Sequence, residues 1–155
     1  MQWVFDVFLH CDPDGFCIKS ALQLSAEYGS LEMIKFLVEK HDFDIFDKDS
    51  GSDNAFLISA RKGKTDQMEY FVNKNPDILR SVCNENFNAL HLSASYGTLQ
   101  TTKFLVEEHD FDISDSSNKN KITALELAQR NRNTDQVEYL KSKKVKKSSY
   151  FFLKN

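Results

Sequence analysis

The sequence predicts an all-α solenoid in which short helix-turn-helix units stack side by side. Three observations lead to this prediction. A ten-residue motif recurs four times at a spacing of 34 or 35 residues, each copy begins with a helix-capping residue, and a second segment with helical apolar spacing follows it. With 155 residues, of which 41% are hydrophobic and 28% charged, the chain has the composition of one globular domain.

The motif is clearest in residues 20–29, Ser-Ala-Leu-Gln-Leu-Ser-Ala-Glu-Tyr-Gly, and in residues 88–97, Asn-Ala-Leu-His-Leu-Ser-Ala-Ser-Tyr-Gly. More divergent copies occupy residues 54–63 and 123–132. A capping residue, a small residue and two large apolar residues predict a short helix that packs closely against its neighbours. The second position is alanine in every copy: Ala21, Ala55, Ala89 and Ala124.

Both ends of this first helix carry local signals. Its first residue has a side chain that can accept a hydrogen bond from an unpaired amide of the helix start. These capping residues are Ser20, Asn54, Asn88 and Thr123. Because a left-handed conformation is least costly for glycine, we expect the closing glycines to end their helices in that conformation. They are Gly29, Gly63 and Gly97, and the fourth copy has Arg132 instead.

A second helix is predicted after each motif. Ile34, Leu37 and Val38 follow the first copy at helical spacing, and apolar residues take the same places after the other copies. Acidic residues lie in the first turn, where the helix dipole favours an anion: Glu32, Asp66 and Asp135. A single helix pair cannot bury its apolar face, whereas stacked pairs bury theirs against one another.

Units that are two repeats apart resemble each other more closely in sequence than neighbouring units do. Residues 36–45 return 68 residues later as 104–113, and residues 65–70 return 69 residues later as 134–139. The simplest interpretation is the duplication of a block of two units.

These motifs resemble the ankyrin repeat. Its Thr-Pro-Leu-His-x-Ala start is similar to Ser-Ala-Leu-Gln-Leu-Ser at residues 20–25 and to Asn-Ala-Leu-His-Leu-Ser at residues 88–93. The resemblance covers residues 12–141 and implies an ankyrin-repeat solenoid of four units. Their expected bounds are 12–45, 46–78, 79–113 and 114–141.

The departures from the family pattern predict a stability below that of a consensus array. The proline is alanine in every copy, and the histidine survives only as His91, where the resemblance implies hydrogen bonds that brace the loop. The loop glycine is largely lost, with Asn86 as a tolerable substitute.

The two ends of the chain are open to more than one interpretation. Residues 1–11, rich in large apolar residues, are expected to form a half-repeat helix that caps the first unit; the alternative is that the chain begins inside a longer array. The last fifteen residues carry six lysines and no acid, against a net charge of −9 for the rest. The tail 142–155 is expected to extend the last helix, to act as a nuclear-import signal, or to touch an anionic membrane.

The sequence offers no catalytic set, cofactor or metal site. His41 and His109 occupy equivalent loops about 20 Å apart at roughly 10 Å per stacked layer, so they do not converge on a metal. The acidic body argues against nucleic acid as the main ligand, and nothing points to a small-molecule substrate. Three cysteines are too few for a disulfide framework and favour a reducing, intracellular setting.

The resemblance implies that partners lie in a concave groove, lined by the turn before each first helix and by the end of that helix. Exposed aromatic and arginine side chains there would suit a protein interface. For Tyr28 and Tyr96 the alternative is packing against adjacent helices. The expected binding residues are Lys19, Glu27, Tyr28, Asp53, Arg61, Lys62, Phe87, Ser95, Tyr96, Ile122, Arg130 and Asn131.

We therefore expect a non-catalytic adaptor or scaffold that acts as a monomer and binds a protein partner of unknown identity. The expected location is cytoplasmic, or nuclear if the tail is an import signal. Two alternatives are a regulator targeted to the nucleus or a membrane surface by its tail, and the ankyrin part of a larger multidomain protein.

Overall fold

The computed structural model describes residues 20–152, with the side chains of residues 20–144. The predicted half repeat at 1–11 and the binding residue Lys19 lie outside this range. The described chain forms eight α-helices in four consecutive pairs, which we call units 1 to 4. The first helices are α2 (Ala21–Tyr28), α4 (Ala55–Lys62), α6 (Ala89–Tyr96) and α8 (Ala124–Arg130). The second helices are α3 (Leu31–His41), α5 (Thr65–Lys74), α7 (Leu99–Lys103) and α9 (Thr134–Phe152).

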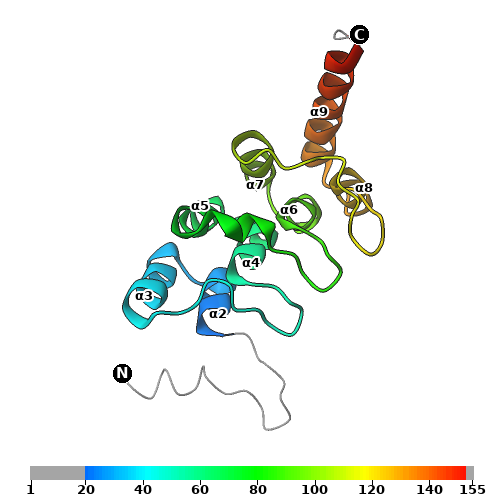
Figure 1. Cartoon of the computed structure of the whole chain (residues 1–155). Helices are drawn as coiled ribbons and strands as arrows, with labels where there is room; N and C mark the ends of the chain where they lie inside the picture. The colour runs from blue at the N-terminus through cyan, green and yellow to red at the C-terminus, as the bar shows by residue number, and fades with distance from the viewer. Residues whose placement is uncertain (1–19, 153–155) are drawn as a thin grey trace.

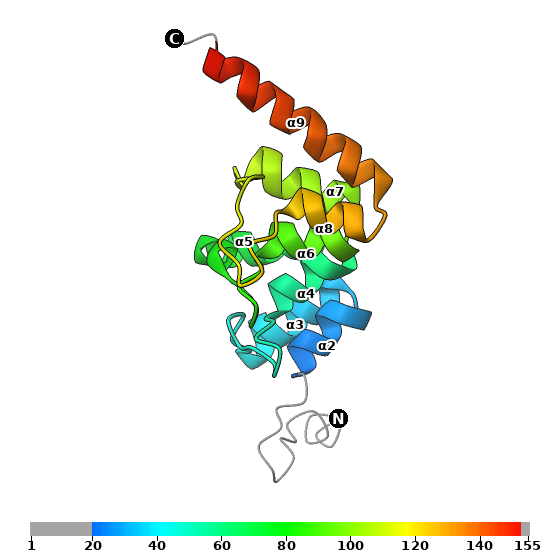
Figure 2. The same cartoon turned by 90° about the vertical axis from the view of Figure 1, so that its right-hand side faces the viewer.

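The units stack in register, as the sequence predicts (Figure 1). Helices α2, α4, α6 and α8 form one layer in which each helix packs against the next. The second helices form the other layer, and α9 extends beyond the rest of the stack (Figure 2). The core lies between the layers and includes Phe56, Leu57, Met68, Phe71 and Leu90, each of which is fully buried. The apolar faces of both helix layers therefore meet in one continuous core.

The predicted capping residues begin all four first helices. The side chains of Ser20, Asn54, Asn88 and Thr123 each accept a hydrogen bond from the amide three residues later. The last helix continues through most of the tail, because α9 runs from Thr134 to Phe152. Two short segments depart from α-helix: a 3₁₀ helix at Pro76–Arg80, and a π-helical turn at Phe104–Glu108 that continues α7.

The prediction for the closing glycines holds for Gly63 alone, which has φ 73°. Gly29 and Gly97 are extended, with φ −92° and −82°, so the left-handed conformation predicted for them is wrong. At Gly97 a side chain is excluded by lack of space instead, because a Cβ would lie 2.5 Å from the carbonyl oxygen of Ala60 in the neighbouring unit. At Gly29 a Cβ would lie 2.9 Å from the carbonyl oxygen of Ser25.

Left-handed backbone occurs instead where the family's glycines are lost. Ser52, Asn86 and Lys121 hold equivalent places two residues before a helix cap, with φ 59°, 59° and 52°. Arg132, which replaces the closing glycine of unit 4, has φ 59°. A side chain in this region costs about 1–2 kcal/mol. Where the chain has lost a glycine of the family pattern, the residue that replaces it thus has a strained backbone conformation.

Second helices are tied together at the boundary between units 1 and 2. The Tyr70 hydroxyl donates to Glu39 Oε1 at 3.1 Å, and Lys74 pairs with the same carboxylate at 3.3 Å while its ammonium lies 5.5 Å from the Tyr70 ring centroid. These contacts hold the pKa of Glu39 below its ordinary value, chiefly through the Tyr70 hydrogen bond. Burial, then the hydrogen bond to Glu39, raises the pKa of Tyr70 to about 12.

An equivalent cluster ties units 3 and 4 together. Tyr139 donates to Glu107 at 3.0 Å, and Lys143 pairs with Glu107 at 2.8 Å. Between units 2 and 3 the corresponding residues are Asn73, Phe104 and Glu108, which cannot form it. The clusters therefore join the two units within each block of the sequence and are missing at the boundary between the blocks.

Removing strain should stabilise the array. We expect Arg132→Gly and Lys121→Gly each to raise the free energy of unfolding by about 0.5–1 kcal/mol, since relief of the left-handed cost is partly offset by the greater chain entropy of glycine. Urea denaturation measures the change. Lys119→Gly is the matched control, because this exposed residue has no positive φ and should lose stability. Equal effects at 119 and 121 would contradict the assignment of strain.

The two blocks should respond separately to loss of their clusters. We expect Tyr70→Phe to speed amide hydrogen exchange severalfold in α3 and α5, and Tyr139→Phe to do so in α7 and α9, because each change removes a hydrogen bond within one block. Tyr96→Phe is the control, since Tyr96 is 62% exposed and its hydroxyl makes no hydrogen bond with the residues that the structure describes. Faster exchange in α7 after Tyr70→Phe would show that the blocks are coupled along this side.

Candidate functional site

A groove of about 410 Å³ crosses units 2 to 4 on the side of the first helices and the turns. Its lining includes residues from the turn before α4, from the turn before α6, and from the helices α4, α6 and α8. Five of the predicted binding residues lie in it: Asp53, Arg61, Phe87, Ser95 and Tyr96. The two register positions chosen from the sequence therefore converge on one surface.

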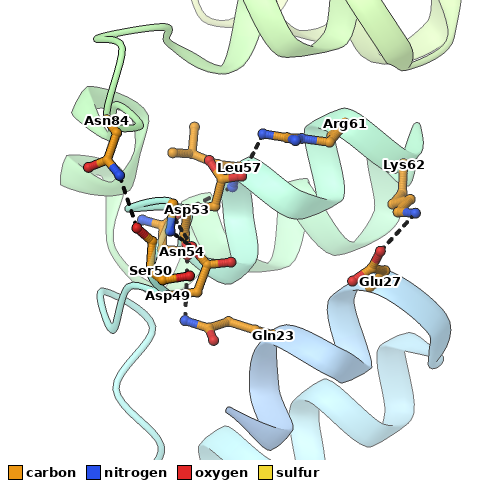
Figure 3. A network of polar contacts seen from close by, with 11 residues as sticks. Gln23, Glu27, Asp49, Ser50, Asp53, Asn54, Leu57, Arg61, Lys62 and Asn84 are labelled. Atoms are coloured by element: carbon orange, nitrogen blue, oxygen red, sulfur yellow. Dashed lines mark hydrogen bonds and ion pairs between the residues drawn. The ribbon is translucent and has the colours of Figure 1, made fainter. Parts of the chain in front are cut away.

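Arg61 connects the turn of its own unit to the next unit. Its Nη2 lies 2.5 Å from Asp53 Oδ2, and its guanidinium carbon lies 5.7 Å from the centroid of the Tyr96 ring. The side chain of Asp53 is 10% exposed and that of Arg61 is 37% exposed. Figure 3 shows Arg61 on α4 and Asp53 at the start of that helix. The carboxylate thus orients the guanidinium, which lies against the aromatic ring.

Lys62 makes the same kind of connection to the preceding unit. Its ammonium lies 3.0 Å from Glu27 Oε1 and 5.5 Å from the centroid of the Tyr28 ring (Figure 3). The side chain of Glu27 is 11% exposed, whereas that of Lys62 is 37% exposed. Two adjacent residues of α4 therefore place one cation against a tyrosine of unit 1 and one against a tyrosine of unit 3.

Both tyrosines face solvent. Tyr28 is 77% exposed and Tyr96 is 62% exposed, although each ring also lies against a cation of the adjacent helix α4, as the packing alternative expects. They occupy the same register position in α2 and α6. Large aromatic surface of this kind is what protein interfaces use for their strongest contacts.

The C-terminal end of the predicted site lies on α8. The Asn131 side chain donates to Ser95 Oγ at 2.6 Å and so joins units 3 and 4. Ser95 itself is 5% exposed. Arg130 is exposed and holds in α8 the register position that Arg61 holds in α4. Ser95 is therefore buried in this contact, whereas Arg130 and Asn131 are both exposed.

The predicted exposure of Ile122 is wrong, and that of Phe87 holds only in part. Ile122 is 9% exposed because the side chain of Asn118 holds both its backbone amide and its carbonyl, at 3.1 and 2.6 Å. Phe87 is half-buried, with its ring centroid 5.5 Å from that of His91. Ile122 is therefore buried beneath the groove and does not form part of its exposed surface.

His91 braces the groove from below, as the resemblance implies. Its Nδ1 lies 2.7 Å from Asn88 Oδ1, and its Nε2 lies 3.1 Å from the carbonyl oxygens of Asp115 and Ile122. Burial lowers the pKa of His91 and outweighs these carbonyls and the Asp115 carboxylate, which act in the opposite direction. Burial between two units thus disfavours the charged form of the ring.

Gln23 does in unit 1 what His91 does in unit 3. It occupies the same register position, and its Nε2 donates to the carbonyl oxygens of Asp47 and Asp53 at 3.0 and 3.5 Å. These two residues are the counterparts of Asp115 and Ile122. A glutamine can therefore replace the histidine of the family without loss of the bond to the next turn.

Sequence reasoning missed part of the lining. Cys83, Asn84 and Glu85 come from the turn before α6, and Leu92 and Leu127 from the helices. Asn84 accepts a hydrogen bond from Ser52 at 2.5 Å and donates to the Ser50 carbonyl at 2.9 Å, so it joins two turns. Asn84 and Glu85 do not recur at the equivalent positions of the other turns, so the repeat pattern does not mark them.

No metal cluster of three or more histidine, cysteine or acidic side chains occurs in the part of the chain that the structure describes. His41 and His109 instead pack edge-on against aromatic rings of their own units, Phe36 and Phe104, with centroids 4.7 and 4.6 Å apart. None of the helices within residues 20–152 has the length and hydropathy of a membrane span.

Acid should weaken the fold through His91. Its pKa is lowered in the folded state, so the unfolded chain binds more protons below the ordinary value of 6.5. We expect the full contribution of His91 to stability above about pH 6.5 and a progressive loss below it. Urea midpoints from pH 7.5 to 5 measure this loss. His91→Gln, which copies the residue that unit 1 has at this position, should show a flatter profile; equal slopes would contradict this role of His91.

Comparison with known proteins agrees with this architecture. A family model of ankyrin repeats, with three copies, matches residues 56–150, which is more than half of the chain. No curated protein is similar enough to be matched to it. The first unit, which precedes the matched region, has the same capped helix pair in the structure. The chain belongs to the ankyrin-repeat family.

Proposed function

We propose that this protein is a non-catalytic adaptor or scaffold that holds a protein partner in the groove of units 2 to 4 and against Tyr28 and Lys62 next to it. Ankyrin repeats are generally protein–protein interaction modules and are typically non-catalytic. The observation that carries the proposal is the exposed strip formed by Tyr28, Lys62, Arg61 and Tyr96. Tyrosine and arginine are enriched among the residues that dominate binding energy.

The strip is arranged before any partner arrives. Asp53 fixes Arg61, and Glu27 fixes Lys62, through carboxylates that are mostly buried. Ordering a long side chain at an interface costs about 0.5–1.5 kcal/mol. Because these cations are already held by carboxylates and tyrosine rings, they lose less conformational entropy on binding. The free-energy cost of forming an interface is therefore lower.

A tail-targeted regulator remains the alternative, with a location experiment as its test. Part of the tail has a structural role, because Lys143 pairs with Glu107 and lies 5.3 Å from the Tyr139 ring centroid. Deletion of residues 145–155 preserves this contact and removes three of the six terminal lysines. An unchanged cellular location after that deletion would contradict targeting by the tail.

The groove proposal predicts a separation of binding from folding. We expect Tyr96→Ala and Tyr28→Ala each to weaken partner binding about tenfold or more, since each removes an exposed ring and a cation contact. Binding is measured by calorimetry with the partner, and folding by circular dichroism. Phe36→Ala in α3 is the aromatic control, because Phe36 is 43% exposed on a second helix.

Unchanged affinity in the folded double variant Tyr28→Ala/Tyr96→Ala would remove the groove from the account. Loss of affinity in Phe36→Ala alone would move the interface to the second helices. Phe87 is not used in this test, because its contact with His91 would confound binding with stability.

A further inference from the structure

We infer that residues 1–11 dock on the open end of unit 1, as the last turns of a second helix packed against α3, with Phe5 opposite Phe36. This inference concerns the end of the stack and is independent of the groove. It adds a register and a contact to the half repeat expected from the sequence. Three features carry it: apolar side chains left open on unit 1, the pattern of residues 1–11, and the length of chain between the two.

Within residues 20–152 nothing precedes unit 1, which forms one end of the stack (Figure 1). Met33 is 48% exposed, whereas the residues at its register position in units 2 to 4 are between 0% and 3% exposed. These residues are Gln67, Thr101 and Gln136. Gln67 and Gln136 each donate to the carbonyl oxygen of the glycine that ends the preceding first helix, at 3.4 and 3.1 Å. Met33 therefore holds a position that a preceding unit covers elsewhere in the stack.

Phe36 allows a direct comparison with unit 3. Phe36 and Phe104 hold the same register position, and each ring packs edge-on against a histidine of its own unit, with centroids 4.7 and 4.6 Å apart. Phe104 is 5% exposed, but Phe36 is 43% exposed. Because the residue type and the local contact are the same, the difference reflects the neighbour that unit 2 supplies to unit 3. Met33 and Phe36 lie three residues apart on one face of α3, and such an apolar end of a stacked array requires a cap.

The pattern of residues 1–11 fits a second helix and the start of the turn after it. At the period of 34 residues, four of its apolar residues fall on buried or half-buried apolar positions of unit 1. These pairs are Trp3 with Leu37, Val4 with Val38, Leu9 with Phe43, and Cys11 with Ile45. Asp6, the one acidic residue of the segment, falls on the position of the exposed Lys40. The segment thus carries apolar residues where the core of such a unit needs them.

The residue that this register places opposite Phe36 is also apolar. In units 2 and 4 the register position of Phe36 is held by Tyr70 and Tyr139, and each tyrosine donates to a glutamate of the preceding second helix. The residue 34 positions before the first of these glutamates, Glu39, is Phe5. A tyrosine therefore faces a glutamate at two boundaries, and a phenylalanine faces a phenylalanine at this one. Both sides change from polar to apolar together, as a contact between them requires.

The connecting chain has the length that this arrangement needs. Twelve residues, 42–53, connect the end of α3 to the cap Asn54. At the same register the second helix before unit 1 ends at residue 7, and twelve residues, 8–19, lead from there to the cap Ser20. Attachment through so short a linker gives residues 1–11 an effective concentration on the order of millimolar. This favours the segment over a second copy of the chain as the occupant of the open end.

Trp3 is the one tryptophan of the chain, so its fluorescence in the full protein tests the inference. We expect native emission at shorter wavelength than in urea. Phe36→Glu should shift the emission to longer wavelength and raise acrylamide quenching severalfold, because a charge opposite Phe5 undocks the segment. Lys35→Glu is the matched control, since this neighbouring position is exposed in all four units. Circular dichroism checks the fold of both variants. Native emission equal to that in urea, or equal shifts in the two variants, would overturn the inference.

A rescue tests the register itself. We expect Phe5→Glu to expose Trp3, and the double variant Phe5→Glu/Phe36→Tyr to restore the native emission, because the new pair can form the hydrogen bond that joins Glu39 and Tyr70. Phe8→Glu is the control, since Phe8 falls on the position of the exposed Asp42 and should tolerate a charge. A double variant no better than Phe5→Glu would overturn the register. Native emission that shifts on dilution, with dimers in sedimentation, would overturn the inference in favour of a second copy.

Discussion

Close contact between the first helices of neighbouring units holds this array together. A helix pair of this length cannot bury its apolar face alone, so each unit is stable only against another. Ala26, Ala60 and Ala94 are fully buried along this layer, and the space at Gly97 is filled by the backbone of the preceding unit. Small residues are required there because a larger side chain would force neighbouring first helices apart. The register of the whole array follows from that contact.

Stacking in register also creates the groove. Equivalent residues of successive first helices lie one stacked unit apart. Residues that recur at one repeat position therefore form a row along the surface. Tyr28, Lys62 and Tyr96 form such a row, and Arg61 joins it from the neighbouring position. Each exposed cation–ring contact contributes only about 0.5–1 kcal/mol. Its main consequence is the placement of side chains, which matters for recognition more than for stability.

The two sides of the stack are held differently. On the turn side, hydrogen bonds cross every boundary: from Gln23 between units 1 and 2, from Asn54 and Asn84 between units 2 and 3, and from His91 between units 3 and 4. On the side of the second helices, the glutamate–tyrosine–lysine cluster occurs at alternate boundaries only. The groove therefore crosses the boundary between units 2 and 3, at which the second helices lack this cluster. This alternation fits the interpretation of a duplicated two-unit block, because the boundary between units 2 and 3 lacks the residues of the cluster.

The repeat, its period, the four capping residues, the buried faces and the row of equivalent positions that holds the candidate site can all be recognised in the amino-acid sequence. All of these are local or periodic, and a helix cap or an apolar stripe is encoded within a few residues. No local pattern indicates that Ile122 is buried, that Gly29 and Gly97 are extended, or that Arg61 lies between Asp53 and Tyr96. Asn118, Ala60 and the neighbouring helices impose these outcomes through packing and hydrogen bonds whose geometry is set when the units stack. A register position names which residues face the groove, but the contacts of each side chain decide whether it belongs to the frame or to the surface.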